Sequence, residues 1–280
     1  MSPSNWRWLR RVLLIIQLLM LLPIGWFIYH LLMPRNYFST KAEVLPLNLT
    51  TGPFQTTYYA STNARGILIV ATGDGGWSGQ WEEPMALHAA AAGYAVGGWD
   101  CRNFANTRSF NQPQLVEAFN AAVAAVRQRA KLPATCPVWY TGWSTGAEWA
   151  LAAAASPQRD PHLIGVLPAA PGERSRYGIT SEDLLGLLST GPGSFSLTEL
   201  APALQGIHVV QFSAGLDPLD DATWLDALGP QAPHKLIRIP GVLHDMDGAG
   251  ERFQAEFDMA IQWMIDTPCL PQAPSRADPP

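Results

Sequence analysis

Charged residues are scarce in this chain of 280 residues. They make up 15% of it, with 18 Lys and Arg against 23 Asp and Glu, whereas soluble domains usually carry roughly 25%. Too few basic residues are present for a nucleic-acid-binding surface. The small net charge of −5, with 48% hydrophobic residues, excludes disorder over most of the chain. The composition therefore predicts a folded chain with a sizeable core.

Cysteine is rarer still, with three residues in all. So few thiols exclude a small scaffold held together by disulfides. No group of cysteines and histidines has the spacing of metal ligands, so we predict no metal and no cofactor.

The apolar excess is concentrated near the N-terminus. Residues 12–33 read VLLIIQLLMLLPIGWFIYHLLM, without Lys, Arg, Asp or Glu. At about 1.5 Å per residue, a helix of this length spans roughly 33 Å, enough for the core of a bilayer. Arg7, Arg10 and Arg11 precede the run, and such residues stay on the cytoplasmic side. We therefore predict a single-pass anchor in a bacterial inner membrane, with residues 1–37 as cytoplasmic tip and anchor and the remainder in the periplasm.

A cleaved signal peptide is the alternative interpretation of this run. Its apolar region would have about 7–15 residues, followed by small residues at the cleavage site. Here the run is longer, and the residues that follow it, PRNY, contain no A-x-A pattern. Residues 1–37 hold four arginines and no acid, so without them the net charge falls from −5 to −9.

Beyond residue 37, apolar strand-like segments alternate with helical ones. Strands are expected at 55–61, 66–72, 94–100, 137–141, 163–167, 207–213 and 235–239, and helices at 80–92, 114–131, 144–155, 220–228 and 251–265. This order predicts an α/β domain over 38–267, with a mainly parallel sheet and helices on both faces. Residues 171–205 interrupt it as an insertion or small lid, and the proline-rich residues 268–280 are expected to form a disordered tail.

The run Gly142-Trp143-Ser144-Thr145-Gly146 matches G-x-S-x-G between an expected strand and an expected helix. In that context the pattern is typical of the α/β-hydrolase fold, where the serine occupies a strained turn. The glycines leave room for close backbone packing, and the helix N-terminus stabilises negative charge. We predict that Ser144 is a nucleophile. The alternative is a serine that caps an ordinary helix.

A nucleophilic serine needs a base and an acid that orients the base. In α/β-hydrolases the acid and then the histidine follow the serine along the chain. Asp217 and His244 each follow an expected strand, at the carboxyl edge of the sheet where such sites gather. We therefore predict the triad Ser144, Asp217 and His244. Weaker candidates are the acids Asp220 and Asp221 and the histidines His88, His162, His208 and His234.

Two backbone N–H groups are needed to stabilise the oxyanion of such a reaction. One is expected from Thr145, directly after the nucleophile. The other is expected from the glycine-rich run Gly73-Asp74-Gly75-Gly76-Trp77, which follows the 66–72 strand, and we favour the amide of Asp74. A plain turn is the alternative interpretation of this run.

The GDGGW run, the run Val96-Gly97-Gly98-Trp99-Asp100 and the elbow together resemble the VirJ family of bacterial periplasmic virulence proteins, over roughly residues 67–265. The resemblance implies a periplasmic α/β-hydrolase that cleaves the aminoacyl ester of aminoacylated phosphatidylglycerol. An aminoacyl ester suits a serine esterase, and its free ammonium group suits an acidic site. We expect further substrate-binding residues near the nucleophile, namely Gly73, Gly75, Trp77, Asp100, Trp143, Glu148 and Asp245. Each carboxylate has the alternative of an ordinary loop or helix-start residue.

Two other functions stay open on the sequence alone. One is a broader carboxylesterase, thioesterase or peptidase. The other is a non-catalytic partner of an envelope secretion system, against which the complete triad counts. No nucleic-acid partner is expected, and the sequence identifies no protein partner.

The cysteines permit one pairing. Cys136 begins the elbow strand and Cys269 follows the last expected helix, which returns to the same edge of the sheet. A periplasm permits disulfides, so Cys136–Cys269 is the candidate pair. Cys101 ends a strand at the opposite edge and is left over.

Overall fold

The computed structural model describes residues 12–17, 19–25, 41–77, 81–246 and 249–269. The chain divides into two compact units, Met1–Arg35 and Asn36–Pro280. In the first unit, residues 12–17 and 19–25 are helical. Within the described ranges, none of the helices combines the length and the apolar character needed to cross a membrane. Residue 18 and residues 26–33 of the expected anchor lie outside the described residues, as do residues 270–280 of the expected tail.

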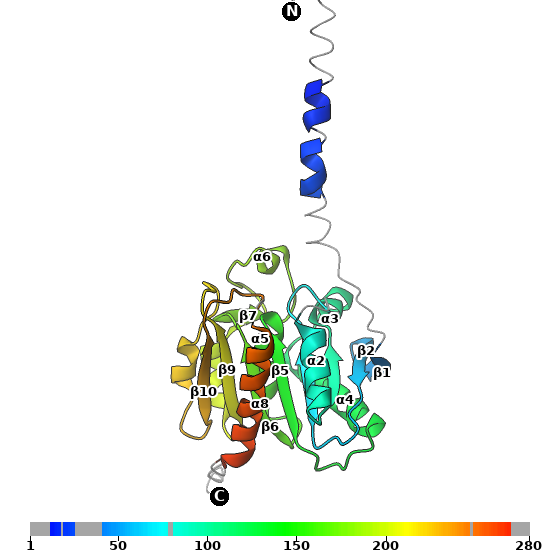
Figure 1. Ribbon diagram of the computed structural model, residues 1–280, viewed down its shortest axis with the longest axis vertical. Helices are drawn as coiled ribbons and strands as arrows, with labels where there is room; N and C mark the ends of the chain where they lie inside the picture. The colour runs from blue at the N-terminus through cyan, green and yellow to red at the C-terminus, as the bar shows by residue number, and fades with distance from the viewer. Residues whose placement is uncertain (1–11, 18, 26–40, 78–80, 247–248, 270–280) are drawn as a thin grey trace, which may run out of the picture. The chain divides into compact units, whose positions relative to one another are not determined.

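An eight-stranded sheet forms the centre of the second unit (Figure 1). Its order is β1-β2-β4-β3-β5-β6-β9-β10. The hairpin of β1 and β2 is antiparallel, and β2 joins β4 antiparallel, whereas all pairs from β4 to β10 are parallel. The mainly parallel sheet is therefore confirmed. The strands are β1 (Glu43–Leu49), β2 (Gly52–Tyr59), β3 (Ile67–Ala71), β4 (Ala95–Trp99), β5 (Val138–Trp143), β6 (Leu163–Ala169), β9 (His208–Ala214) and β10 (His234–Ile239).

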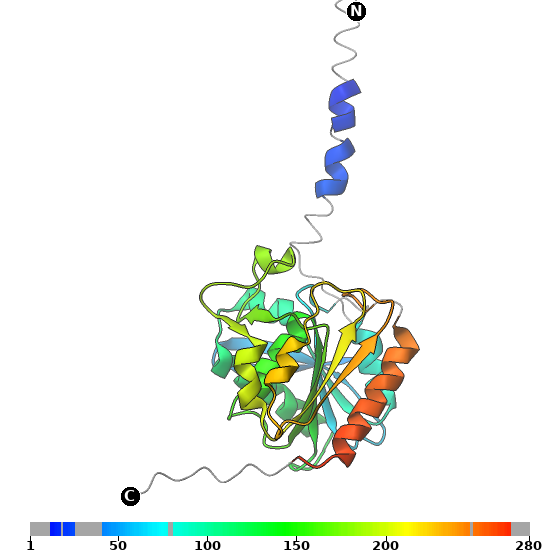
Figure 2. The same cartoon turned by 90° about the vertical axis from the view of Figure 1, so that its left-hand side faces the viewer.

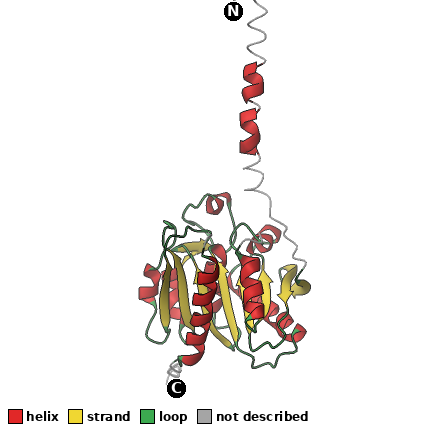
Figure 3. Cartoon of the chain, in the orientation of Figure 1, coloured by secondary structure: helices red, strands yellow, loops and turns green. Residues whose placement is uncertain are grey.

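Helices cover both faces of the sheet (Figures 2 and 3). Strand β3 shows why, because Ile67 and Ile69 belong to one apolar cluster while Leu68 and Val70 belong to the other. Alternate residues of a strand point to opposite faces, so a strand that is apolar throughout must be covered twice. The first cluster includes α4 (Gln112–Arg129) and α5 (Thr145–Ala154), and the second includes α2 (Glu82–Ala91) and α8 (Gly250–Asp266).

Residues 171–205 form small elements of their own. The strands β7 (Arg174–Arg176) and β8 (Ser194–Ser196) pair to form a two-stranded sheet. The short helix α6 (Ser181–Leu184) lies between them along the chain. The helix α7 (Leu197–Leu200) and the 3-10 helix η1 (Ala201–Leu204) follow. Helix α6 lies beyond the end of the main sheet at which β5 ends (Figure 1).

Three elements differ from the sequence expectation. Strand β1 is absent from that expectation. It contains Pro46, and it lies at the edge of the sheet, where proline is tolerated. Helix α3 (Cys101–Thr107) is also absent from it, and the Asp100 side chain caps this helix by accepting from the amide of Asn103. The helix expected at 220–228 is the shorter 3-10 helix η2 (Thr223–Ala227).

The predicted disulfide between Cys136 and Cys269 is wrong, because both thiols are free, as is that of Cys101. Cys136 precedes β5, whereas the Sγ atom of Cys269 lies 3.4 Å from Nδ1 of His208, the first residue of β9. Strand β6 lies between β5 and β9. Neighbouring strands are about 4.8 Å apart. The two cysteines therefore reach strands that are not neighbours, and no local pattern in the sequence indicates that strand order.

Candidate active site

Ser144 occupies a strained turn between β5 and α5, with φ 53° and ψ −125°. Residues with side chains rarely adopt a positive φ. The two glycines beside it allow this turn to pack. A Cβ atom on Gly142 would lie 2.4 Å from the backbone of Gly146, and one on Gly146 would lie 2.3 Å from the carbonyl oxygen of Thr72. The G-x-S-x-G spacing is therefore a packing requirement of this turn.

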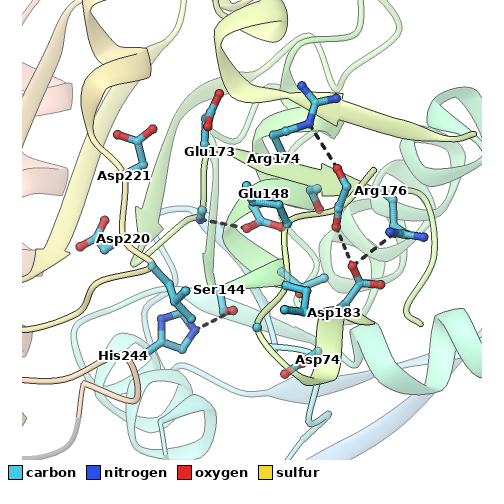
Figure 4. A pocket seen from close by; sticks show the side chains of 18 of the residues that line it. Asp74, Ser144, Glu148, Glu173, Arg174, Arg176, Asp183, Asp220, Asp221 and His244 are labelled. Carbon is cyan, nitrogen blue, oxygen red and sulfur yellow. Dashed lines mark hydrogen bonds and ion pairs between the residues drawn. The ribbon is translucent and has the colours of Figure 1, made fainter. Parts of the chain in front are cut away.

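Ser144, His244 and Asp217 form one hydrogen-bonded chain, of which Figure 4 shows the bond between Ser144 and His244. The Nε2 atom of His244 lies 2.9 Å from Oγ of Ser144, and its Nδ1 atom lies 2.6 Å from Oδ2 of Asp217. The Asp217 side chain is fully buried, while that of His244 is 31% exposed. The structure thus brings together the three residues that the sequence selected, across the carboxyl ends of β5, β9 and β10.

Two further contacts fix the acid and the base. The amide of Leu219 donates to Oδ1 of Asp217 at 2.9 Å, so each carboxylate oxygen has one partner. The indole N–H of Trp143 donates to the backbone carbonyl of His244 at 2.5 Å. The sequence suggests that Trp143 binds substrate. It is absent from the described lining of the cavity and instead holds the loop that carries the histidine.

The alternative candidates have other partners in the structure. Asp220 accepts from the amide of Ala214 at 2.6 Å, and Asp221 accepts from the amide of Thr223 at 2.8 Å. His208 bonds the carbonyl of Thr267 at 2.7 Å. These contacts give the two acids and His208 roles in holding the fold, although both acids also line the cavity.

A cavity of about 630 Å³ opens beside Ser144 and is also lined by Thr145 and His244. The described walls of the cavity are acidic, because they contain six acidic residues and two arginines. The acids are Asp74, Glu148, Glu173, Asp183, Asp220 and Asp221, and the bases are Arg174 and Arg176. Arg176 is already paired, with Asp183 at 3.2 Å and Glu182 at 3.3 Å. The cavity therefore favours a substrate that carries positive charge.

Glu148 is the most buried of these carboxylates (Figure 4). It lies in the first turn of α5, one helical turn after the nucleophile, and its Oε1 atom accepts from the amide of Gly172 at 2.9 Å. Burial, with a smaller contribution from the nearby Asp74, raises the pKa of Glu148 to about 7, against hydrogen bonds from Ser175 and Gly172 that lower it. Burial also raises the pKa of Asp74, against the charges of His244 and Arg102.

Most of the other expected substrate-binding residues do not line the described cavity: Gly73, Gly75, Trp77, Asp100 and Asp245. Trp77 and Asp100 are structural instead. The ring of Trp77 packs closely over Gly98, where an added Cβ atom would lie 2.6 Å from the ring. The backbone amide of Trp77 donates to the Asp100 carboxylate at 3.2 Å. The GDGGW and VGGWD runs are thus packed against each other. Gly73 lies against the ring of Trp143, where a Cβ would approach it to 2.8 Å.

Sequence reasoning missed the contribution of the 171–205 segment to the cavity. Arg174 and Arg176 lie two residues apart in β7, and Asp183 belongs to α6. The one available signal was the alternation of the two arginines, since residues i and i+2 of a strand share a face. Nothing in the sequence indicated that this face meets the nucleophile.

No protein-family model and no curated protein matches the chain. Solved structures do match it over most of its length. Dienelactone hydrolase from Anabaena variabilis is 17% identical with a TM-score of 0.58, covering 81% of this chain and 98% of that one. Est1E from Butyrivibrio proteoclasticus is 13% identical with a TM-score of 0.57, covering 80% and 99%. The hydrolase GrgF from a Penicillium species is 11% identical with a TM-score of 0.58, covering 82% and 99%. At these identities the likeness concerns the fold alone, and the chain has the predicted α/β-hydrolase fold.

Proposed function

We propose that this protein is a serine hydrolase that cleaves an ester. The observation that carries the proposal is the hydrogen-bonded chain of Asp217, His244 and Ser144 beside an open cavity. His244 takes the proton of Ser144 as the serine oxygen attacks the ester carbonyl, and Asp217 stabilises the imidazolium that forms. His244 then protonates the leaving alcohol. A water molecule, deprotonated by the same histidine, releases the acid from Ser144.

The backbone amides of Thr145 and Asp74 are the proposed donors to the oxyanion. Both residues line the cavity together with Ser144. Thr145 is the first residue of α5, so its N–H belongs to the positive end of a helix. Asp74 follows β3, the neighbour of the nucleophile strand in the sheet. Donors in these positions stabilise the negative charge that develops on the carbonyl oxygen.

The proposed substrate is the aminoacyl ester of aminoacylated phosphatidylglycerol. The acidic cavity supports it, because six acidic residues and two arginines line the space beside Ser144 that the aminoacyl group and its ammonium would fill. The resemblance of the GDGGW and VGGWD runs to the VirJ family supports it as well. A general carboxylesterase or thioesterase remains the second candidate, favoured by the two arginines in the same wall. A non-catalytic VirJ-like partner of an envelope secretion system is the third.

We also propose that residues 12–33 anchor the enzyme in a bacterial inner membrane, with the N-terminus in the cytoplasm and the hydrolase domain in the periplasm. The run without charges and the arginines before it support this arrangement. An anchored enzyme stays beside the leaflet that holds its substrate. Flotation of the full chain with vesicles tests the anchor. The control is flotation after an alkaline wash, which removes peripheral proteins and leaves an anchored chain in the vesicle fraction.

A fluorophosphonate probe tests the chemistry directly. Wild type should be labelled and Ser144→Ala should not, because only an activated serine reacts. Equal labelling of both, or of neither, would contradict the hydrolase and favour the non-catalytic alternative. The substrate is tested by incubating the full chain with vesicles that contain lysyl-phosphatidylglycerol and measuring released lysine. Labelling without lysine release would leave a hydrolase of another ester.

A further inference from the structure

Six leucine side chains are exposed on three loops next to the cavity. Their exposed fractions include 63% at Leu185 and 60% at Leu216. Three line the cavity and are exposed themselves, which places them at its mouth. We call this set the leucine rim, and its members are Leu185, Leu187, Leu188, Leu216, Leu219 and Leu243.

The three loops meet and form one surface. A Cβ atom on Gly186 would lie 3.3 Å from Cδ1 of Leu219, so the loop after α6 touches the loop that carries Asp217. The amide of Leu216 donates to the carbonyl of Val242 at 2.9 Å, which joins that second loop to the residues just before His244. The loops that carry the six leucines thus meet beside the cavity, although the leucines lie up to 58 positions apart in the sequence.

The backbone holds the rim outward. Residues 184–188 read LLGLL, without a charge, and form a tight turn in which Gly186 has φ 68°. The amide of Gly186 donates to the backbone carbonyl of Asp183, and that of Leu187 donates to the backbone carbonyl of Glu182, both at 3.0 Å. Asp183 is itself fixed by Ser189, whose hydroxyl donates to it at 2.6 Å. An apolar turn fixed by hydrogen bonds and exposed to water indicates a surface that meets a partner.

We propose that the leucine rim docks onto a lipid bilayer and places the mouth of the cavity against the leaflet. The inference rests on the proposed membrane anchoring and deepens it. Hydrocarbon fits the rim better than a protein does, because the rim consists of leucine, which is under-represented among the residues that dominate protein interfaces. The rim is also continuous with an acidic cavity, an arrangement that matches an amphiphile with a cationic polar head inside and acyl chains outside.

The length of the chain also favours a bilayer as the occupant. Nine residues, 34–42, separate the apolar run from β1, which begins at Glu43. Fully extended, they span at most roughly 30 Å. In an anchored chain, the start of β1 therefore stays within roughly 30 Å of the end of the apolar run. A docked rim would let a lipid ester enter the cavity without carrying its acyl chains through water.

Spin labelling of the full chain in vesicles of phosphatidylethanolamine and phosphatidylglycerol tests this proposal. A nitroxide is attached to Leu185→Cys or Leu216→Cys in a Cys269→Ser background, since Cys101 and Cys136 are buried. The matched control is Met259→Cys on α8, which is 58% exposed and does not line the cavity. We expect labels at 185 and 216 to collide more with oxygen, which concentrates in hydrocarbon, than with a water-soluble nickel complex. The label at 259 should show the reverse.

The outcomes separate this proposal from the proposed function. Labels at 185 and 216 that respond like the label at 259 would overturn docking. Labels that are immobilised and shielded from both reagents would indicate a protein or a second copy on the rim, and would overturn it too. The fluorophosphonate probe measures hydrolysis separately, and flotation measures the anchor. A chain that floats with the vesicles, but whose labels at 185 and 216 respond like the label at 259, would overturn docking alone.

A second variant adds a functional measurement. Leu185→Asp combined with Leu216→Asp places two charges on the rim at positions that do not line the described cavity. Hydrolysis of an ester embedded in vesicles should fall by at least about tenfold, because charged groups resist contact with hydrocarbon. Hydrolysis of a short water-soluble ester should stay within about twofold, because the hydrogen-bonded chain is untouched. An equal loss on both esters would contradict docking.

Discussion

The indole N–H of Trp143 donates a hydrogen bond of 2.5 Å to the backbone carbonyl of His244. The residue before Ser144, the proposed nucleophile, thus holds the backbone of His244, the proposed base. Their rings also lie 5.5 Å apart, centroid to centroid. Because β10 and the loop after it lie at the edge of the sheet, this contact ties an edge loop to the central strand β5.

Trp143→Phe should weaken this link. An aromatic ring stays at this position, and the hydrogen bond to the carbonyl of His244 is lost. The loss of that bond costs about 0.5–1.5 kcal/mol, which corresponds to a fall of roughly twofold to tenfold in kcat/KM. The measurement is steady-state hydrolysis of a soluble ester. Trp139→Phe is the matched control, because the indole nitrogen of Trp139 is buried without a partner. A loss of the same size in both variants would mean that the ring alone matters.

Glu148 should make the binding of cationic substrates depend on pH. Its pKa is raised to about 7 by burial, so the carboxyl gains its charge as the pH rises through neutrality. A pair of isosteric esters tests this, one with a trimethylammonium group and one with a tert-butyl group. KM for the charged ester should fall by roughly threefold to tenfold between about pH 6 and about pH 8, relative to the neutral one. Glu148→Gln should remove that difference. If the ratio of the two KM values in wild type does not change with pH, Glu148 does not bind the cationic group.

The same carboxyl should affect stability with a definite sign. The folded state keeps the proton of Glu148 up to about pH 7, whereas the unfolded state releases it around its ordinary value of 4.5. Between pH 4.5 and about pH 7 the folded state therefore binds more protons than the unfolded state. The contribution of Glu148 to the free energy of unfolding falls as the pH rises through this range and levels off above it. The shift corresponds to about 3 kcal/mol. Urea unfolding at about pH 5 and about pH 8 should show that Glu148→Gln loses less stability than wild type over this range.

Gly146→Ala should disrupt the elbow. Its Cβ atom would lie 2.3 Å from the carbonyl oxygen of Thr72, just after β3, and backbone cannot move aside cheaply. We expect a loss of about 1–3 kcal/mol or more in the free energy of unfolding, and loss of fluorophosphonate labelling. Gly229→Ala is the control, because a Cβ there meets nothing within 4 Å. Normal labelling of Gly146→Ala would show that the elbow tolerates a shift of the two strands.

The sequence predicted Ser144, Asp217 and His244, which the structure brings together, because their signals were local. The elbow depends on residues 142–146, and Asp217 and His244 each follow a strand that was recognisable from its own residues. The parts that failed were those that depend on strand order or on packing between distant runs. Trp77 and Asp100 looked like site residues, yet the ring of Trp77 packs over Gly98 and the carboxylate of Asp100 caps α3. The contribution of Arg174, Arg176 and Asp183 also depends on how 171–205 folds back.

The position of β10 has a consequence for how the protein loses its structure on heating. This strand pairs only with β9 among the described strands, and five of its six residues are at least partly exposed. The proposed base, His244, lies in the loop after β10, whereas Ser144 lies in the turn after the central strand β5. Edge strands separate from a sheet more readily than central ones. On warming, β10 and the loop with His244 should therefore unfold first. The reactivity proposed for Ser144 should be lost while the helices and most of the sheet are still intact.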